Sequence, residues 1–180
     1  MKAVALIPAR YDATRFPGKL MAKLGSKSVI LRTYESTVNT GLFEEVYVVT
    51  DSDIIFEEIT ASGGKAIKSQ KEHECGSDRI AEAAEKIEAD IIVNVQGDEP
   101  MMHPEMINGT IKPMLDDEKV MGTMLAMPII NEDQYYDPNR LKIIHNLKGD
   151  ALYTSRSPVP YCKKFSPEIG AKCLYGFFGF

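Results

Sequence analysis

Short apolar runs alternate along the chain with longer stretches in which apolar positions recur every three or four residues. The runs predict strands at residues 4–7, 46–50, 65–68, 91–95, 121–130 and 141–145. The periodic stretches predict helices at 29–40, from Asp51 or Ser52 to Gly63-Gly64, at 76–89 and at 104–115. Strands that alternate with helices of this length form βαβ units, so we expect one α/β domain over residues 1–180, with a mostly parallel sheet flanked by helices.

The stretch from Gly76 to Ala89 has the clearest helical pattern, with Ile80, Ala83, Ala84 and Ile87 on one face. Ser77 is the expected N-cap of this helix. The chain ends in an aromatic apolar run at residues 175–180, which predicts a strand with no turn after it. We therefore expect the domain to be truncated at its C-terminus.

Charge and cysteine content narrow the function classes. The net charge is −5 over 180 residues, and acids and bases are interspersed. This pattern argues against a general nucleic-acid binder, which usually carries a basic stripe. The apolar run that begins at Ala3 ends at Pro8, which is too short to cross a membrane. Three irregularly spaced cysteines favour a reducing compartment. We expect a cytoplasmic protein that binds neither nucleic acid nor membrane.

Three permanent cations, Arg10, Arg15 and Lys19, follow the first strand. Ligands of α/β proteins bind beyond the carboxyl ends of the strands, where this loop is expected. Arginine binds phosphate oxygens through two parallel hydrogen bonds, and lysine adds a compact positive charge. Gly18 lets the backbone approach an anion closely. The loop is predicted to bind a triphosphate and to stabilise departing pyrophosphate. The alternative is a solvated basic loop.

Asp98 lies just past the end of the most apolar strand, again at the carboxyl edge. Magnesium prefers one or two carboxylates together with substrate phosphates, so Asp98 is the candidate ligand for Mg²⁺. Gly97-Asp98 is also an ordinary turn sequence, which is the alternative interpretation. Glu99 is expected to be a solvated neighbour. The three histidines, His73, His103 and His145, have no ligand-like spacing and are expected to be surface or loop residues.

Five ordered motifs resemble the 3-deoxy-manno-octulosonate (Kdo) cytidylyltransferases, also called CMP-Kdo synthetases. The motifs are Pro-Ala-Arg-Tyr…Thr-Arg-Phe-Pro-Gly-Lys at 8–19, Cys-Gly-Ser-Asp-Arg at 75–79, Asn-Val-Gln-Gly-Asp-Glu-Pro at 94–100, Pro-Asn-Arg-Leu-Lys at 138–142 and Ala-Leu-Tyr-Thr-Ser-Arg-Ser at 151–157. The resemblance implies a nucleotide-diphospho-sugar transferase fold of Rossmann-like type, usually a homodimer. It also implies transfer of CMP from CTP to Kdo for lipopolysaccharide biosynthesis, with release of pyrophosphate.

The resemblance also assigns roles to residues. The catalytic set would be Arg10, Lys19 and Asp98, with magnesium on Asp98. Arg10, Arg15 and Lys19 would hold the triphosphate, Gly76, Ser77 and Arg79 the nucleoside, Gln96 the sugar or nucleotide, and Arg156 the sugar carboxylate. A capped helix start is the alternative for residues 76–79, and a surface turn before Pro158 is the alternative for Arg156.

The sequence departs from the family pattern at three places. Cys75 stands where the family has serine, and Leu174 and Phe178 stand where it has a histidine and a tyrosine of the sugar pocket. The family also continues beyond residue 180 through a dimer-forming segment and a second metal-binding acid. These departures leave two alternatives to Kdo activation. One is CMP transfer to another acidic sugar, an 8-amino-Kdo or a sialic-type sugar, and the other is a truncated chain that binds CTP without full activity.

Overall fold

Residue contacts divide the chain into two compact units. The computed structural model describes residues 1–12, 16–71, 73 and 75–180. Unit 1 comprises Met1–Thr123 together with Gly176–Phe180, and unit 2 comprises Met124–Tyr175. The expectation of one domain over residues 1–180 stays a prediction, and the two units are described separately.

Unit 1 is built on a mostly parallel sheet with the strand order β5-β4-β1-β6-β10. Neighbouring pairs are parallel from β5 to β6, and β10 is antiparallel to β6. The strands are β1 (Ala3–Ala9), β4 (Glu45–Thr50), β5 (Ala66–Lys68), β6 (Ile91–Val95) and β10 (Lys172–Gly179). A two-stranded sheet, β2 (Lys23–Leu24) with β3 (Lys27–Ser28), follows the short helix η1 (Lys19–Met21). The predicted α/β class with a mostly parallel sheet is confirmed.

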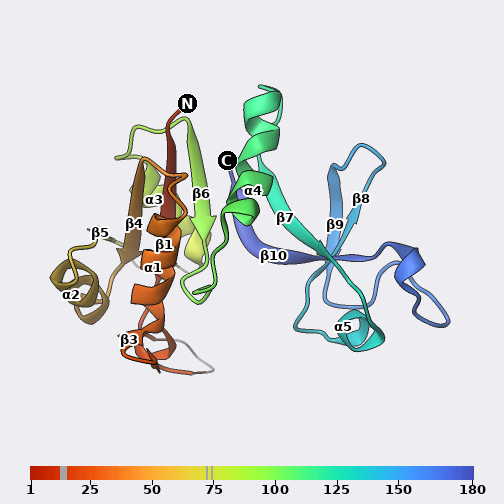
Figure 1. Cartoon of the computed structure of the whole chain (residues 1–180), viewed down its shortest axis with the longest axis horizontal. Coiled ribbons are helices and arrows are strands. Elements are labelled where there is room, and N and C mark those ends of the chain that lie inside the picture. Colours follow the sequence, from red (N-terminus) through yellow and green to blue (C-terminus); the bar gives the residue numbers. More distant parts are fainter. Residues whose placement is uncertain (13–15, 72, 74) are drawn as a thin grey trace. The chain divides into compact units, whose positions relative to one another are not determined.

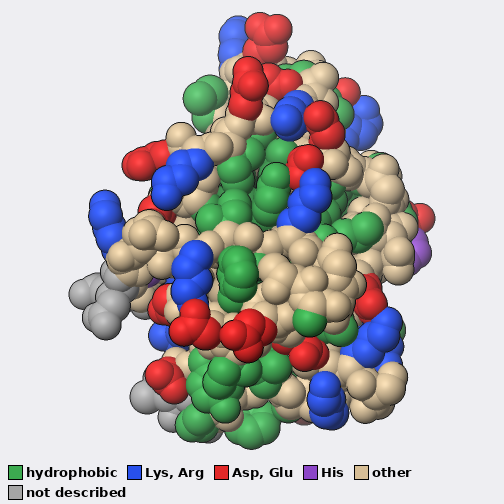
Figure 2. All heavy atoms as spheres, turned by 90° about the vertical axis from the view of Figure 1, so that its left-hand side faces the viewer, with side chains coloured by type: hydrophobic (Ala, Val, Ile, Leu, Met, Phe, Trp, Pro, Cys, Tyr) green, Lys and Arg blue, Asp and Glu red, His purple; other side chains and the backbone are tan. Residues whose placement is uncertain are grey.

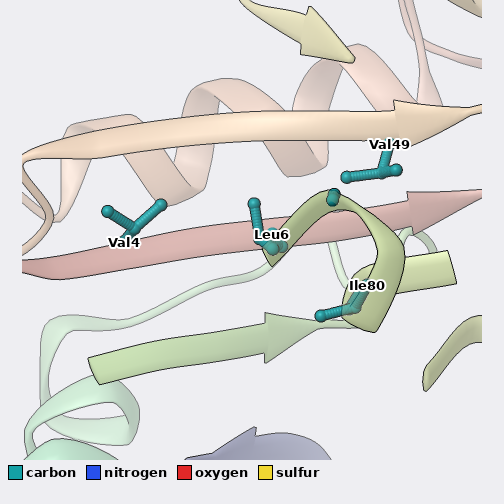
Figure 3. Packing of buried hydrophobic residues seen from close by; sticks show 5 residues of the cluster. Val4, Leu6, Val49 and Ile80 are labelled. Atoms are coloured by element: carbon teal, nitrogen blue, oxygen red, sulfur yellow. The ribbon is translucent and has the colours of Figure 1, made fainter. Parts of the chain in front are cut away.

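Helices cover both faces of this sheet. They are α1 (Val29–Asn39), α2 (Asp53–Ala61), α3 (Gly76–Ala84) and α4 (Pro104–Asp116). In Figure 1, α1 crosses in front of β1 and β4, and α3 lies behind them. One core cluster joins Val4 and Leu6 of β1 to Val49 of β4 and Ile80 of α3, and Figure 3 labels these four residues. Ala5 points to the opposite face of the sheet from Val4 and Leu6, and it is equally buried. Burial on both faces explains why β1 is continuously apolar.

The helix ends follow ordinary capping rules, with one correction. Ser52 accepts a hydrogen bond from the Ile55 amide at 3.4 Å, as the sequence predicts for the start of α2. The predicted N-cap Ser77 is wrong, because Cys75 occupies the N-cap position and Ser77 lies inside the first turn of α3. This helix also ends at Ala84 rather than Ala89. The backbone beyond it tightens into three-residue turns, in which the Ile87 amide donates to the Ala84 carbonyl at 3.0 Å.

Unit 2 contains elements that the hydrophobic pattern does not reveal. Its elements are β7 (Thr123–Pro128), α5 (Glu132–Tyr136), β8 (Lys142–His145), β9 (Ala151–Ser155), η2 (Pro167–Ile169) and the first part of β10. The sequence does not predict β9, because Leu152 and Tyr153 are both largely exposed and show no alternation. Pairing with β8 makes this segment a strand. Helix α5 has only five residues, too few to show a helical period.

The core of unit 2 is small and includes a buried tyrosine. Ile129, Tyr135, Ala171 and Cys173 form its buried cluster. The Tyr135 hydroxyl donates to the Pro160 carbonyl oxygen, and burial raises the pKa of this phenol to about 12. A buried tyrosine of this kind fills the core with its ring and satisfies its hydroxyl through the backbone.

The surface carries charges of both signs. Figure 2 shows acidic and basic side chains interspersed over one face, with apolar groups between them. Among the described residues, no helix combines the length and apolar character that a membrane crossing requires. The charges seen on this face agree with the interspersed charge pattern of the sequence.

Replacing Ile80 by alanine tests the core of unit 1. The side chain projects from α3, packs against β1 and β4, and is fully buried. Its loss should therefore lower the free energy of unfolding by about 2–5 kcal/mol. Urea denaturation followed by circular dichroism measures this change. Ile54→Ala is the matched control, because Ile54 is 51% exposed on α2 and should change stability by no more than about 0.5 kcal/mol. Equal effects of the two substitutions would contradict the assigned core.

Candidate active site

The loops after β1 and β6 meet at the carboxyl edge of the parallel sheet. Lys19, at the start of η1, forms an ion pair with Asp98, which follows β6; its Nζ contacts Asp98 Oδ2. The two side chains are 48% and 39% exposed, so both remain accessible to a ligand. The structure thus brings the predicted phosphate lysine and the predicted magnesium ligand into direct contact, although 79 positions separate them in the chain.

Glycine at position 97 permits the close approach of these loops. A Cβ atom there would lie 3.0 Å from the Pro8 carbonyl oxygen and 3.3 Å from the Cδ1 atom of Ile30. Thr33 Oγ1 of α1 donates to the Gly97 carbonyl oxygen at 2.9 Å, and the Glu99 amide donates to the Gln96 carbonyl oxygen at 3.1 Å. Residues 96–99 are therefore a pinned turn that presents the Asp98 carboxylate, so the turn interpretation and the ligand interpretation describe the same segment.

Gly18 shapes the other loop. Its φ of 69° is in the left-handed region, and its amide donates to the Tyr11 carbonyl oxygen at 2.9 Å. This bond closes the segment between the first strand and Lys19. Arg10 lies at the start of the segment and is exposed. Arg15, the remaining predicted phosphate ligand, lies outside the described residues.

Arg79 of α3 is a buried charge that joins three elements. Its Nη1 donates to the Ala9 carbonyl oxygen at 3.0 Å, and its Nη2 donates to Asp51 Oδ2 at 2.6 Å. The residue is 4% exposed, and its Nε has no hydrogen-bond partner among the described residues. The predicted nucleoside residue therefore ties the ends of β1 and β4 to α3, with one donor left over.

Two adjacent hollows open beside Arg79 in unit 1. The first, called the Gln96 hollow, has a volume of about 310 Å³. Its lining residues are Pro8, Arg10, His73, Cys75, Gly76, Arg79 and Gln96. The second, called the Asp51 hollow, has a volume of about 510 Å³. It is lined by Arg10, Tyr11, Asp12, Asp51, Ser52, Asp53, Ile54, His73 and Arg79. Arg10, His73 and Arg79 belong to both hollows, so these three side chains stand at their junction.

The predicted nucleoside segment forms one wall of the Gln96 hollow. Gly76 sits against β1, because a Cβ atom there would lie 3.2 Å from the Cγ atom of Pro8. Cys75 occupies the N-cap position of α3, and its side chain makes no capping hydrogen bond to the helix backbone. Its thiol donates to Asp78 Oδ2 at 3.1 Å. Ser77 is exposed and does not line the hollow. Gln96 also lines the hollow and contacts Asn94 Oδ1 through its amide nitrogen at 3.4 Å.

His73 lines both hollows, although its sequence spacing does not single it out. Its Nε2 lies 2.5 Å from Glu82 Oε2 of α3, and the two side chains are only 10% and 11% exposed. Glu82 also accepts from the Ser69 hydroxyl at 2.9 Å and the Gln70 amide at 2.8 Å. His73 lies in a loop, as the sequence predicts, and its side chain also lines both hollows. Its partner lies nine positions away on a helix, which sequence spacing does not reveal.

Arg156 and Lys142 lie in unit 2. Arg156 is exposed, and its Nη1 donates to the Pro138 carbonyl oxygen at 3.0 Å. Lys142 is fully buried and donates to the Asp137 carbonyl oxygen at 2.5 Å, while the Arg156 carbonyl oxygen lies 3.4 Å away. Burial lowers the pKa of the Lys142 ammonium. The buried lysine thus contacts the backbone of both Asp137 and Arg156.

Asp98 fits magnesium as a single protein ligand. Within the part of the chain that the structure describes, no three His, Cys, Asp or Glu side chains are close enough together to hold a metal ion. Magnesium commonly keeps several waters and is bound by one or two carboxylates and substrate phosphates, so one accessible carboxylate beside a cationic loop suffices. Asp98 in contact with Lys19 has this character.

Comparison with known proteins agrees with this geometry. The sequence model described as cytidylyltransferase matches residues 4–177. A 3-deoxy-manno-octulosonate cytidylyltransferase of Christiangramia forsetii is 51% identical over 170 residues, which cover 93% of this chain and 68% of the relative. The chain belongs to the 3-deoxy-manno-octulosonate cytidylyltransferase family. A second relative with this name, from Flavobacterium johnsoniae, is 53% identical over 163 residues, covering 89% of this chain and 67% of the relative.

A solved structure supports the same membership. It is titled as CMP:2-keto-3-deoxy-manno-octonic acid synthetase complexed with CTP, and it matches this cytidylyltransferase with a TM-score of 0.91 and 36% identity. The match covers all of this chain and 74% of the solved chain. The predicted nucleotidyltransferase fold is confirmed, and the chain spans about two thirds of the length of the two curated relatives.

The pKa of Glu82 generates a prediction about pH. The hydrogen bond from His73, followed by the bond from the Gln70 amide, lowers this pKa from 4.5 to about 2. A lowered pKa means that the carboxylate stabilises the fold above the unfolded value of 4.5, and that this contribution is lost as the pH falls towards 2. We expect the urea midpoint of wild type to fall more steeply between pH 5 and pH 2.5 than that of Glu82→Gln.

Circular dichroism at a series of pH values measures these midpoints. Glu57→Gln removes an exposed carboxylate on α2 and should keep the steep pH dependence of wild type. Parallel curves for wild type and Glu82→Gln would contradict the role assigned to this carboxylate.

Proposed function

We propose that this chain transfers CMP from CTP to 3-deoxy-manno-octulosonate, giving CMP-Kdo and pyrophosphate. The observation that carries the proposal is the contact of Lys19 with Asp98, which places an anion-binding cation and a metal-binding carboxylate at one edge of the sheet. The names of the relatives supply the nucleotide and the sugar. The product, CMP-Kdo, would be the activated form of Kdo for lipopolysaccharide biosynthesis.

The cations of the first loop would bind the triphosphate. Arg10 is exposed at the junction of the two hollows, and Lys19 stands beside Asp98. Lys19 pairs with the Asp98 carboxylate. A triphosphate would offer Lys19 a second set of anionic oxygens. The lysine would then stabilise the negative charge that builds up on pyrophosphate as it departs. Arg15, outside the described residues, remains a predicted third ligand.

Asp98 would hold Mg²⁺ together with the phosphate oxygens of the nucleotide. When bound, magnesium would supply Lewis-acid polarisation of the phosphate that is attacked. The chain's own contribution is to position this carboxylate through the pinned turn at Gly97 and to place the cation of Lys19 beside it. Because such transfers need mainly positioning and charge neutralisation, no nucleophilic side chain is required.

Arg156 would bind the carboxylate of the acidic sugar. Its guanidinium is exposed, and its backbone is held by the buried Lys142. Arginine binds carboxylates through two parallel hydrogen bonds, which suits an anionic sugar. Leu174 and Phe178 replace a histidine and a tyrosine of the family pattern, which favours another acidic sugar, such as 8-amino-Kdo or a sialic-type sugar, as the second candidate.

A cytoplasmic homodimer is the proposed working form. Strand β9 ends the strand order of its sheet, and it carries the exposed apolar side chains Leu152 and Tyr153. Leu147 and Tyr161 of the same unit are also strongly exposed. An apolar sheet edge of this kind is suited to pairing with another chain. Cys75, Cys162 and Cys173 are all free, which agrees with a reducing compartment.

Pyrophosphate release tests the function directly. Purified chain is mixed with CTP and Mg²⁺, and Kdo, 8-amino-Kdo and sialic acid are supplied in separate reactions. We expect release with Kdo above that with the other sugars. Release with another sugar instead would replace Kdo by that sugar. If no pyrophosphate is released with any of the three sugars while calorimetry still detects CTP binding, the chain binds the nucleotide without full activity.

Replacing Asp98 by asparagine tests the magnesium site. The substitution keeps the shape of the side chain and removes the charge that would hold the metal, so magnesium-dependent turnover should fall at least about 100-fold. Binding of CTP without metal, measured by calorimetry, should be largely retained. Asp116→Asn is the matched control, because Asp116 is also a partly exposed carboxylate paired with a lysine but lies on α4. Normal turnover of Asp98→Asn would remove Asp98 from the metal site.

A further inference from the structure

Lys142 is a fully buried lysine in the sheet of unit 2. It lies on β8, between β10 and β9 in the strand order, and its register partners are Cys173 of β10 and Ser155 of β9. Taking an ammonium group out of water is costly, and burial lowers its pKa. An apolar side chain would fill the same place at lower cost, so packing alone does not account for a lysine here.

The ammonium of Lys142 holds the turn that begins at Asp137. Its Nζ donates to the Asp137 carbonyl oxygen at 2.5 Å, and the Arg140 amide donates to the same oxygen at 3.1 Å. The Asp137 carboxylate accepts from the main-chain amide of Asn139 at 2.8 Å and from its side-chain amide at 3.0 Å. These bonds converge on Asp137, so they also fix the position of the next carbonyl group in the chain, that of Pro138.

The Pro138 carbonyl oxygen holds the guanidinium of Arg156, whose Nη1 donates to it at 3.0 Å. Arg156 directly follows Ser155, the register partner of Lys142, and its own carbonyl oxygen lies 3.4 Å from the lysine Nζ. The lysine therefore contacts the main chain of the arginine and is linked to the tip of its side chain through Asp137 and Pro138. A guanidinium has five N–H donors, so one bond can orient the group while others bind a ligand.

We propose that Lys142 is a positioning residue, whose buried ammonium sets the guanidinium of Arg156 for the carboxylate of the acidic sugar. The inference rests on the proposed sugar-binding role of Arg156 and adds the group on which the geometry of that contact depends. A carboxylate is bound by two parallel hydrogen bonds only when the plane of the guanidinium faces it. Fixing this plane beforehand reduces the side-chain entropy that is lost on binding. The lysine is fully buried, so it acts through the arginine rather than on the sugar.

Lys142→Met tests the inference, because it removes the ammonium and keeps a long, unbranched side chain. Pyrophosphate release is measured with CTP, Mg²⁺ and Kdo, or with whichever acidic sugar wild type uses. We expect the KM for the sugar to rise about tenfold and the KM for CTP to stay within about twofold. Lys148→Met is the matched control, because Lys148 is exposed in the turn between β8 and β9 and should leave both KM values unchanged.

Ile129→Ala separates positioning from a loss of stability. Ile129 belongs to the buried cluster of the same unit, so its truncation should lower the melting temperature without a selective rise in the KM for the sugar. Lys142→Met should raise this KM even where its melting temperature equals that of wild type, because it removes a buried charge. A similar rise of both KM values in Lys142→Met, or a fall in kcat alone, would reduce the lysine to a structural residue and overturn the proposal.

A double-mutant cycle shows whether the two residues act together. Arg156→Ala should raise the KM for the sugar about 100-fold, and adding Lys142→Met should change it by less than about twofold. Effects that multiply would mean that Lys142 acts by a route other than Arg156, which would overturn the proposal. An unchanged KM for the sugar in Lys142→Met would overturn it as well.

The same measurements distinguish this inference from the proposed function. Turnover of an acidic sugar by wild type, with no selective effect of Lys142→Met, would overturn the inference alone. An unchanged KM for the sugar in Arg156→Ala would remove Arg156 from the sugar site, and the inference with it. If wild type releases no pyrophosphate with any acidic sugar, the proposed function fails and the inference falls with it.

Discussion

The buried guanidinium of Arg79 organises the edge of the sheet on which the site depends. A charge that is 4% exposed is tolerated only when it is paired, and here the partners are the last carbonyl of β1 and the carboxylate of Asp51 after β4. Loss of the Asp51 carboxylate would leave this buried charge uncompensated. The carboxyl ends of two strands and the first turns of α3 are thereby held together.

This constraint explains why the site can be made from exposed side chains. Arg10 follows the Ala9 carbonyl that Arg79 holds, and Gly97 brings the turn after β6 within van der Waals contact of Pro8. Lys19 and Asp98 meet because both of their loops are fixed at this edge. Preorganised charges stabilise a transition state without reorganising at the moment of reaction, which is what nucleotidyl transfer needs.

Glu82 provides a second anchor, which holds the loop that leads to His73. Glu82 lies on the same helix as Arg79 and holds the segment of His73 by three hydrogen bonds. Helix α3 therefore carries both anchors, one aimed at the strands and one at the loop beside the hollows. Its apolar face, including Ile80, packs on β1 and β4, so the core and the site share one support.

The sequence by itself determined the parallel α/β layers and the carboxyl-edge loops. An apolar run such as residues 91–95 is stable only between two covered faces, and motifs such as residues 94–100 are local in the chain. The tertiary structure alone decided what meets across the chain: Lys19 with Asp98, Arg79 with Ala9 and Asp51, and His73 with Glu82. It also decided β9, a strand by pairing rather than by pattern, and the cap at Cys75. These features depend on partners that no local period or propensity encodes, because hydrogen bonds and ion pairs form between atoms that only the fold brings within reach.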